Sequence, residues 1–241
     1  MIVFDDIHKS FNNNAVLKGV SFTVAKAKVH FVMGMSGAGK SVTIKSIIGL
    51  IRPDKGRILV EGREVTGLSE EELVAVRARC QYIFQHATLF DHLTVLENVA
   101  MPVAKRMRVA GAEAKERARA ALAAVHADEM LERFPPELGK GSQKRVAIAR
   151  ALALEPRAIL YDEPTTGLDP VAARRIDALI QETSHRHGLT SMVVSHDLTS
   201  VRSTADHVSF LHEGRIRYDG SADGLFATSD EVLATFMHPR G

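Results

Sequence analysis

The spacing of hydrophobic positions changes along this 241-residue chain, and the change predicts where strands give way to helices. Three short runs, 29–33, 158–161 and 191–194, are mostly apolar and rich in β-branched residues, as is typical of strands buried on both faces. A helical pattern follows the first run, and another begins after Pro170. This alternation predicts an α/β protein with a parallel sheet at its core.

The first quarter of the chain has a different pattern. Residues 2–4 and 20–24 predict strands of a small antiparallel sheet, with turn residues 12–14 between them. Residues 53–56 mark a turn before a short strand over 57–62. Ser69 and Glu72 form a capping-box pattern for a helix that ends near Arg79. The next buried strand is expected at 82–84.

Residues 86–155 are rich in alanine, leucine and charge at helical spacing, as in 113–131, and carry almost no strand signal. Pro135 and Pro136 break this region before a helix expected to begin near Gly141 or Ser142. We therefore expect a helical subdomain over 86–155, inserted into a core made of residues 1–85 and 156–227. We expect residues 228–241 to form a C-terminal tail of this single domain, 1–241.

One glycine-rich segment matches G-x-x-x-x-G-K-[ST], which cradles nucleotide phosphates. It lies between a predicted strand and a helix in which Val42, Ile44, Ile47, Ile48 and Ile51 recur at helical spacing. Free amide groups and the positive end of the helix dipole would face the phosphates. Lys40 would reach the β- and γ-phosphates, and the Ser41 hydroxyl would bind Mg²⁺. The segment, with the following residue as a further nucleotide contact, comprises Gly34, Met35, Ser36, Gly37, Ala38, Gly39, Lys40, Ser41 and Val42.

Polar residues follow three other predicted strands. Asp162 and Glu163 come directly after 158–161, Gln85 follows 82–84, and His196 follows 191–195. Ligands of parallel α/β sheets sit beyond the carboxyl ends of the strands, so these side chains should meet the nucleotide. We expect Asp162 to hold Mg²⁺, and Glu163 to polarise the attacking water. Gln85 would reach Mg²⁺ and the water, and His196 the γ-phosphate; the competing interpretation is that these residues only decorate polar turns.

Composition excludes several classes of protein. Hydrophobic residues make up 45% of the chain, charged residues 25%, and the net charge is +2, too small to indicate a nucleic-acid partner. The single cysteine, Cys80, excludes an internal disulfide and favours a reducing compartment. No apolar run approaches the roughly 20 residues of a membrane span, and no signal-peptide pattern opens the chain. If the protein works at a membrane, another subunit must bring it there.

The order of these motifs resembles the nucleotide-binding subunit of ABC transporters over almost the whole chain. The resemblance implies a P-loop NTPase (RecA-like) fold and an ATPase that uses ATP and Mg²⁺. It also implies that Phe11 stacks on adenine and that residues 167–169 form the D-loop. Glu163, His196, Gln85 and Lys40 would be the catalytic residues, with Ser41, Gln85 and Asp162 at the metal.

The chain departs from the family in one motif, the signature sequence. The family has Leu-Ser-Gly-Gly, whereas this chain has Leu138-Gly139-Lys140-Gly141-Ser142, so Gly139 replaces the serine and Lys140 a glycine. In the family this motif completes the ATP site of a second subunit. A weakened ATP-closed dimer, a shift that brings Ser142 into the serine's role, and a different partner with an intact signature all remain open.

Residues 84–99 and 161–170 resemble bacterial lipid transporters that work with mammalian-cell-entry (MCE) proteins. The resemblance implies phospholipid transport across the bacterial envelope, powered from the cytoplasmic side of the inner membrane. The partners would be a second ABC subunit (another copy or a different one), an integral membrane permease contacted through the Q-loop and helical region, and MCE-type and accessory proteins. No nucleic-acid partner is expected.

Two matters stay open in the sequence. The tail places Val232, Leu233 and Phe236 at helical spacing before Pro239, and it packs either on its own domain or on the neighbouring subunit. The altered signature also permits a non-transport or regulatory ABC ATPase with weak hydrolysis. The transported substrate and its direction are not encoded in the motifs of this chain.

Overall fold

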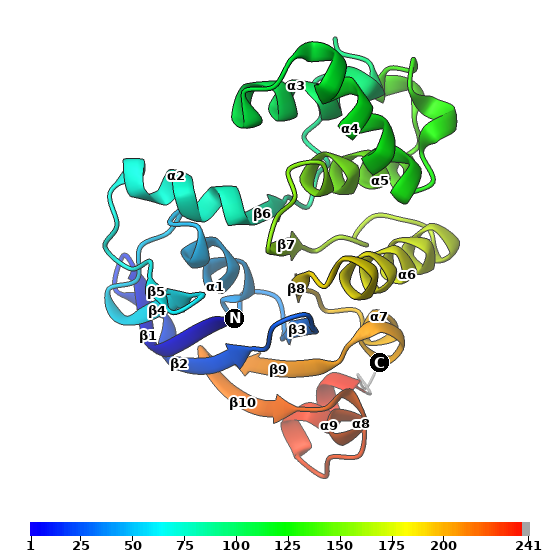
Figure 1. Ribbon diagram of the computed structural model, residues 1–241. Coiled ribbons are helices and arrows are strands. Elements are labelled where there is room, and N and C mark those ends of the chain that lie inside the picture. The colour runs from blue at the N-terminus through cyan, green and yellow to red at the C-terminus, as the bar shows by residue number, and fades with distance from the viewer. Residues whose placement is uncertain (238–241) are drawn as a thin grey trace.

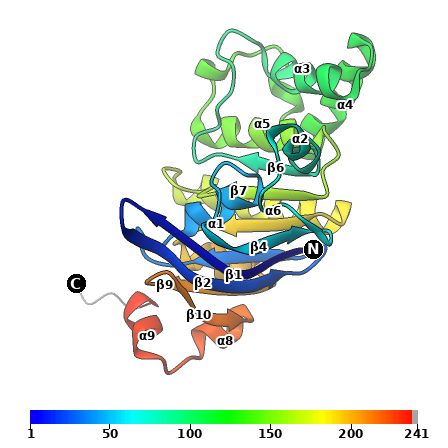
Figure 2. The same cartoon turned by 90° about the vertical axis from the view of Figure 1, so that its left-hand side faces the viewer.

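The fold consists of two sheets and an added helical region. A computed structural model describes residues 1–237. Within them, one sheet has the strand order β2-β1-β4-β5 and the other the order β10-β9-β3-β8-β7-β6. Figure 1 shows the helical region at the top, and Figure 2 shows the first sheet crossing in front of the second. The predicted α/β class is confirmed.

The larger sheet is parallel except at one edge. Strands β6, β7, β8, β3 and β9 pair in parallel, and β10 pairs antiparallel with β9. All residues of β3, β7 and β8 are buried, because helices and the smaller sheet cover both faces. The strands are β3 (Val29–Met33), β6 (Cys80–Ile83), β7 (Ala158–Asp162), β8 (Thr190–Val194), β9 (His207–His212) and β10 (Arg215–Gly220).

The prediction for the strand before Gln85 was partly wrong. The strand begins at Cys80 and ends at Ile83, so Phe84 lies outside it with its side chain 41% exposed. Cys80 is buried, and burial raises the pKa of its thiol to about 12, which makes it unreactive at neutral pH. Strands β9 and β10 were not predicted from the sequence.

The smaller sheet is antiparallel and longer-stranded than its sequence pattern predicts. It consists of β1 (Ile2–Phe11), β2 (Asn14–Val24), β4 (Lys55–Val60) and β5 (Arg63–Glu64). The turn between β1 and β2 places Asn12 and Asn13 at φ values of 46° and 64°, a region that asparagine tolerates. The expected turn is therefore confirmed.

Two helices complete the core on this side. Helix α1 (Lys40–Ile47) packs between the sheets, where Ile44 and Ile47 join a buried cluster with Val32 and Leu160. It ends earlier than the spacing through Ile51 suggests. Helix α2 (Glu70–Arg79) has the expected capping box, in which Ser69 accepts from the Glu72 amide.

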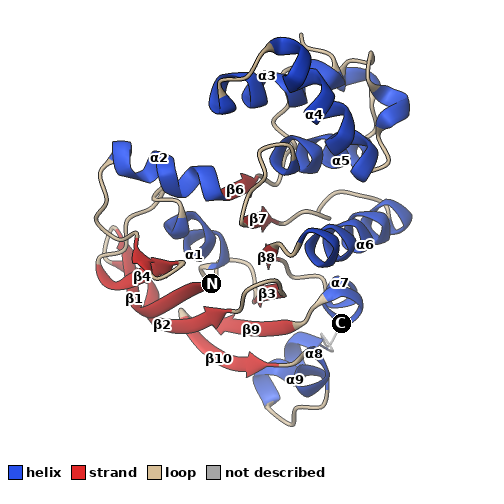
Figure 3. Ribbon diagram, in the orientation of Figure 1, coloured by secondary structure: helices blue, strands red, loops and turns tan. Residues whose placement is uncertain are grey.

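Residues 86–155 contain helices and turns but no strand (Figure 3). The elements are α3 (Val95–Met107), α4 (Gly111–Ala124), α5 (Lys140–Leu152) and two 3-10 turns (Asp128–Met130 and Pro135–Glu137). Small residues such as Ala114 and Ala118 let α4 pack closely on its neighbours. Helix α5 begins at Lys140, slightly before the predicted start.

The remaining helices cover the opposite face of the parallel sheet. They are α6 (Pro170–His187), α7 (Leu198–Thr204), α8 (Ala222–Phe226) and α9 (Glu231–Met237). In α9, Leu233 is buried, and the Phe236 ring meets Phe210 of β9 edge-on at 4.9 Å between centroids. The tail thus packs on its own domain, as one of the two alternatives predicted; Pro239 lies outside the described residues. Among residues 1–237, no helix combines the length and apolarity that crossing a bilayer requires.

Candidate functional site

The loop between β3 and α1 can be built only with glycine at two positions. Gly34 has φ 152°, and a β-carbon there would lie 2.3 Å from the Leu211 carbonyl oxygen. Gly39 has φ 106°, and a β-carbon there would meet the Leu17 side chain at 2.7 Å. Bulkier residues would push the loop off the sheet. The glycines therefore fix the path along which α1 presents its N-terminus.

Lys40 lies folded back onto this loop. Its buried ammonium donates to the carbonyl oxygens of Gly34 (2.8 Å) and Met35 (3.1 Å), and it lies 3.9 Å from Glu163 Oε1. Burial lowers the pKa of Lys40, while the charges of Glu163 and Asp162 oppose that shift. The loop carbonyl groups therefore hold the Lys40 ammonium in place, and the Glu163 carboxylate lies on its other side.

Asp162 ends β7 beside the start of α1. Its Oδ1 accepts a hydrogen bond from Ser41 Oγ (3.0 Å), and its Oδ2 accepts one from Tyr82 Oη (2.5 Å). A hydroxyl and a carboxylate side by side are the hard oxygen donors that Mg²⁺ prefers, and Mg²⁺ keeps several of its waters. The donor set at Ser41 and Asp162 therefore fits a magnesium ion bound together with nucleotide phosphates.

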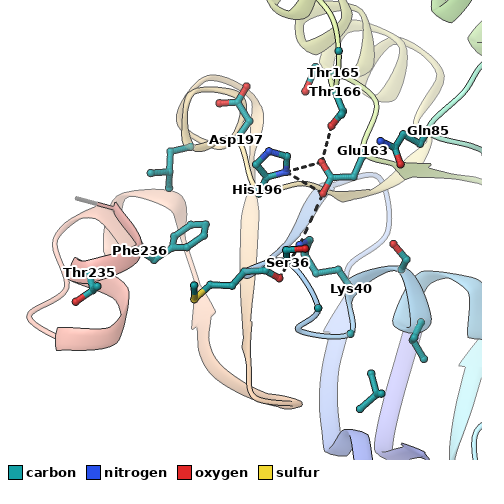
Figure 4. A pocket seen from close by; sticks show the side chains of 18 of the residues that line it. Ser36, Lys40, Gln85, Glu163, Thr165, Thr166, His196, Asp197, Thr235 and Phe236 are labelled. Atoms are coloured by element: carbon teal, nitrogen blue, oxygen red, sulfur yellow. Dashed lines mark hydrogen bonds and ion pairs between the residues drawn. The ribbon is translucent and has the colours of Figure 1, made fainter. Parts of the chain in front are cut away.

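Glu163 turns away from Asp162 although the two are neighbours in the chain. Its φ of 50° places it in the left-handed region, and its amide donates to the Val194 carbonyl. Its carboxylate contacts His196 Nδ1 at 2.9 and 3.1 Å and accepts from Thr166 Oγ1 at 3.1 Å, as Figure 4 shows. The backbone turn directs two adjacent carboxylates to two different sets of partners.

One cleft of about 1870 Å³ collects most of these groups. It brings together the phosphate loop, the strand ends and, across from Gln85, residues of α9 (Figure 4). The predicted site residues that line it are Met35, Ser36, Gly37, Gly39, Lys40, Ser41, Val42, Gln85, Glu163 and His196. Gly34, Ala38 and Asp162 do not line the cleft; Gly34 and Ala38 belong to the same loop, and Asp162 ends β7 next to Glu163.

Two groups of predicted residues lie elsewhere. Phe11 ends β1, away from the lining of the cleft; its ring is 44% exposed and the Lys9 ammonium lies 5.2 Å from its centroid. Residues 139–142 also lie outside the lining, at the tip of α5. A cleft in one copy of the chain therefore does not include the altered signature.

At the tip of α5, which is its N-terminus, no side chain of residues 1–237 forms a capping hydrogen bond. Gly139 occupies the N-cap position, and Lys140 is exposed. A β-carbon placed on Gly167 would lie 3.8 Å from the Lys140 ammonium, so this lysine lies beside the segment after Glu163. Ser142 Oγ accepts from Arg145 within the helix, and the helix already begins at Lys140. The structure gives no support to a shift that moves Ser142 into the cap.

Sequence reasoning missed several residues that hold this site. Tyr82 contacts Asp162, and Thr166 contacts Glu163. Lys144 of α5 donates to the carbonyl oxygens of Phe84 and Gln85, and burial lowers its pKa to about 8. The sequence pattern did not single out Lys144, because it lies among the polar residues of a predicted helix. Its partners are backbone atoms of a segment that is distant in the chain.

The same helix holds the segment after Gln85 at a second point. Arg150 donates to the carbonyl oxygens of Ala87 (3.1 Å) and Thr88 (2.9 Å). Together with Lys144, it fastens residues 84–88 to the helical region, so that the position of the Gln85 backbone depends on α5. Charge-assisted bonds of this kind are about twice as strong as neutral ones.

The parallel sheet, the glycine loop entering a helix and the carboxylate-tipped strand define a P-loop nucleotide-binding protein. The family model described as ABC transporter matches residues 17–166. The chain belongs to the ABC transporter family.

Two curated relatives give the scale of the similarity. The methionine import ATP-binding protein MetN of Rhizobium johnstonii is 41% identical over 92% of this chain, but the chain spans only 61% of that relative. The histidine transport ATP-binding protein HisP of Pseudomonas aeruginosa is 39% identical, with 97% of this chain and 96% of the relative covered. Both belong to transport systems for amino acids by their names.

Two solved structures share the fold. The ATP-binding cassette MJ0796, described as a dimer in a post-hydrolysis state with ADP and Pi, has a TM-score of 0.83 at 30% identity, covering 92% of this chain and 99% of that one. The cbiO1 protein of Clostridium perfringens, part of an ABC transporter complex cbiONQ, has a TM-score of 0.88 at 26% identity, covering 99% and 95%. The fold is that of an ABC cassette.

Proposed function

We propose that this chain is the ATP-binding and hydrolysing subunit of an ABC transporter, which powers transport through a separate integral membrane permease. The observation that carries the proposal is the cleft, where the Lys40 loop faces the Glu163–His196 pair. A phosphate held by Lys40 and the α1 N-terminus would have its terminal group next to that pair. The comparisons with MetN, HisP and MJ0796 support the same class of activity.

The proposed division of labour follows the contacts. Lys40 and the amides of 34–41 bind the phosphates, and residues 1–85 with 156–227 form the nucleotide-binding core. Magnesium, when bound by Ser41 and Asp162 with Gln85 nearby, supplies positive charge against the phosphate oxygens. Glu163 accepts a proton from the attacking water, and His196 and Thr166 hold its carboxylate in place. The exposed ring of Phe11, outside the lining of the cleft, is the proposed apolar surface for the base.

We propose that two such subunits act together. Residues 139–142 lie outside the lining of the cleft of their own chain, which supports a role at the nucleotide of another subunit. The dimer of MJ0796 with ADP and Pi supports this arrangement. The second subunit is another copy of this chain or a different ABC subunit, and the segment 84–99 with the helical region 86–155 is the proposed contact for the permease on the cytoplasmic side of the membrane.

Two cargo classes have support from different observations. Residues 84–99 and 161–170 resemble lipid transporters that work with MCE proteins, which supports phospholipid. The relatives named above are amino-acid systems, which supports a small polar cargo. Copurification with its native permease, followed by stimulation of ATPase activity with phospholipid or with methionine and histidine, separates the two.

The activity itself is tested with the assembled complex. We expect phosphate release from ATP that requires Mg²⁺ and is lost in Lys40→Ala, because the phosphates then lose their cation. Nucleotide binding with negligible hydrolysis, even with the permease present, would favour instead a regulatory ABC protein. The uncapped tip of α5 is the observation that keeps this second candidate open.

A further inference from the structure

Tyr82 stands in register with the strand that carries the two carboxylates. In the parallel pairing of β6 and β7, Tyr82 lies opposite Leu160, and Asp162 is two residues further along. Side chains alternate between the faces of a strand, so Tyr82, Leu160 and Asp162 point to the same face of the sheet. That face is the one covered by α1, which also carries Ser41.

On this face the phenol reaches the carboxylate directly. Tyr82 Oη lies 2.5 Å from Asp162 Oδ2, while Ser41 Oγ lies 3.0 Å from Oδ1. Among residues 1–237, the Lys45 ammonium, at 3.8 Å from Oδ2, is the nearest cation. Each carboxylate oxygen thus has its own hydroxyl partner, one from the metal-binding loop and one from the neighbouring strand.

We propose that Tyr82 is a positioning residue for the metal site, whose hydroxyl fixes the rotation of the Asp162 carboxylate so that Oδ1 faces Ser41. The proposal rests on the function proposed above. Without the phenol, Oδ2 would lose its hydroxyl partner and keep only the Lys45 ammonium at 3.8 Å, so the rotation of the carboxylate about its last bond would be less fixed. Partners that orient a ligand in this way commonly change metal affinity roughly 10- to 100-fold when they are removed.

The surroundings favour a permanent donor at this position. The Tyr82 side chain is half-buried, and burial together with the Asp162 contact raises the pKa of its phenol above the usual value. An ordinary phenol keeps its proton at neutral pH. A carboxylate or an imidazole in its place would change charge beside the metal ligand, whereas a phenol does not.

A purely structural role for the phenol predicts something different. If Tyr82 only filled space at the edge of the sheet, then removing its hydroxyl should leave metal binding unchanged or should weaken nucleotide and metal together. Tyr161 offers a matched control in the same sheet. It is a fully buried tyrosine on β7, and it packs in the cluster on the opposite face.

The test uses the full chain with ADP and with Mn²⁺ as the probe for the divalent site. Affinity for a fluorescent ADP analogue is measured in EDTA, and Mn²⁺ binding to the ADP-saturated protein is measured from the loss of the free-ion EPR signal. For Tyr82→Phe we expect unchanged affinity in EDTA and a Mn²⁺ midpoint raised roughly 10-fold. Tyr161→Phe should match the parent in both measurements.

Three results would overturn the inference while leaving the proposed function intact. These are a Tyr82→Phe midpoint equal to that of the parent, an equal rise in Tyr161→Phe, or a loss of ADP affinity in EDTA as large as the loss of Mn²⁺ affinity. A parent protein that binds no ADP at all would instead contradict the proposed function and the inference with it.

Discussion

The cleft and the tip of α5 are two parts of the proposed ATP site, and they differ in how completely they are built. In and beside the cleft, Lys40, Asp162, Glu163 and His196 all contact other groups of the site. At the tip of α5, a glycine stands at the N-cap and an exposed lysine follows it. The cleft is organised by its own chain, whereas in the proposed dimer the tip would face the nucleotide of a second subunit.

The energetic consequence depends on which role the missing serine would have. A glycine N-cap costs a helix only a few tenths of a kcal/mol relative to serine. A lost hydroxyl that donates to a charged phosphate costs roughly 1.5–3 kcal/mol. Gly139 should therefore leave the stability of α5 almost unchanged. It should weaken the closure of two subunits around ATP.

The largest effect is expected from breaking the cleft. Glu163→Gln removes the base but keeps the shape, so ATP turnover should fall roughly 10²- to 10⁴-fold. ATP binding should persist, because Lys40 and the loop are untouched. Phosphate release and equilibrium nucleotide binding measure the two quantities, and equal turnover in the variant and the parent would remove Glu163 from its proposed role.

Repair of the tip should have the next largest effect. Gly139→Ser combined with Lys140→Gly restores the family's residues, and we expect steady-state ATPase of the dimer to rise by roughly tenfold if a charge-assisted bond is regained. ATP-dependent dimerisation, followed by light scattering, should strengthen in parallel. An unchanged ATPase rate would show that the departure is neutral.

A smaller effect is expected from loosening the cleft without breaking it. Thr166→Val removes the hydroxyl that donates to Glu163 and keeps the volume, so kcat should fall roughly 3- to 10-fold with little change in KM. Thr23→Val, at an exposed position of β2, is the matched control. A drop of equal size in the control would assign the effect to general destabilisation.

The smallest effect on turnover is expected outside both parts, at Asp177 of α6. Its Oδ2 accepts from Ser200, its Oδ1 has no hydrogen-bond partner among residues 1–237, and burial raises its pKa from 3.8 to about 6. The folded state therefore holds this proton more tightly than the unfolded state. Stability from this group is greatest below pH 4 and is lost as the pH rises towards 6.

Asp177→Asn should consequently stabilise the protein at pH 7.5, by about 2 kcal/mol, with ATP turnover unchanged. The gain should shrink as the pH is lowered from about 6 to about 4, since the parent carboxyl becomes neutral there too. Thermal unfolding across this range measures the difference. A gain independent of pH would contradict the assigned titration.

Much of the cleft could be predicted because its residues carry local signals. A glycine loop, a strand that ends in two carboxylates, and polar residues after strands 80–83 and 190–194 are all short-range patterns. Phe84 escaped the correct assignment because an aromatic residue after a strand looks the same whether it is buried or exposed. Tyr82, Thr166 and Lys144 escaped because their partners lie on other strands or belong to the backbone.

The amino-acid sequence by itself determined the α/β class, the phosphate loop and the order of the candidate site residues along the chain. The reason is that the spacing of hydrophobic residues and of glycines is a pattern that a few neighbouring residues carry. Only the tertiary structure decided that neighbouring Asp162 and Glu163 face different partners, that α9 packs on its own domain, and that residues 139–142 lie outside their own cleft. The physical reason is that strand register, a single left-handed residue and long-range packing set those directions. None of these is specified within one stretch of the chain.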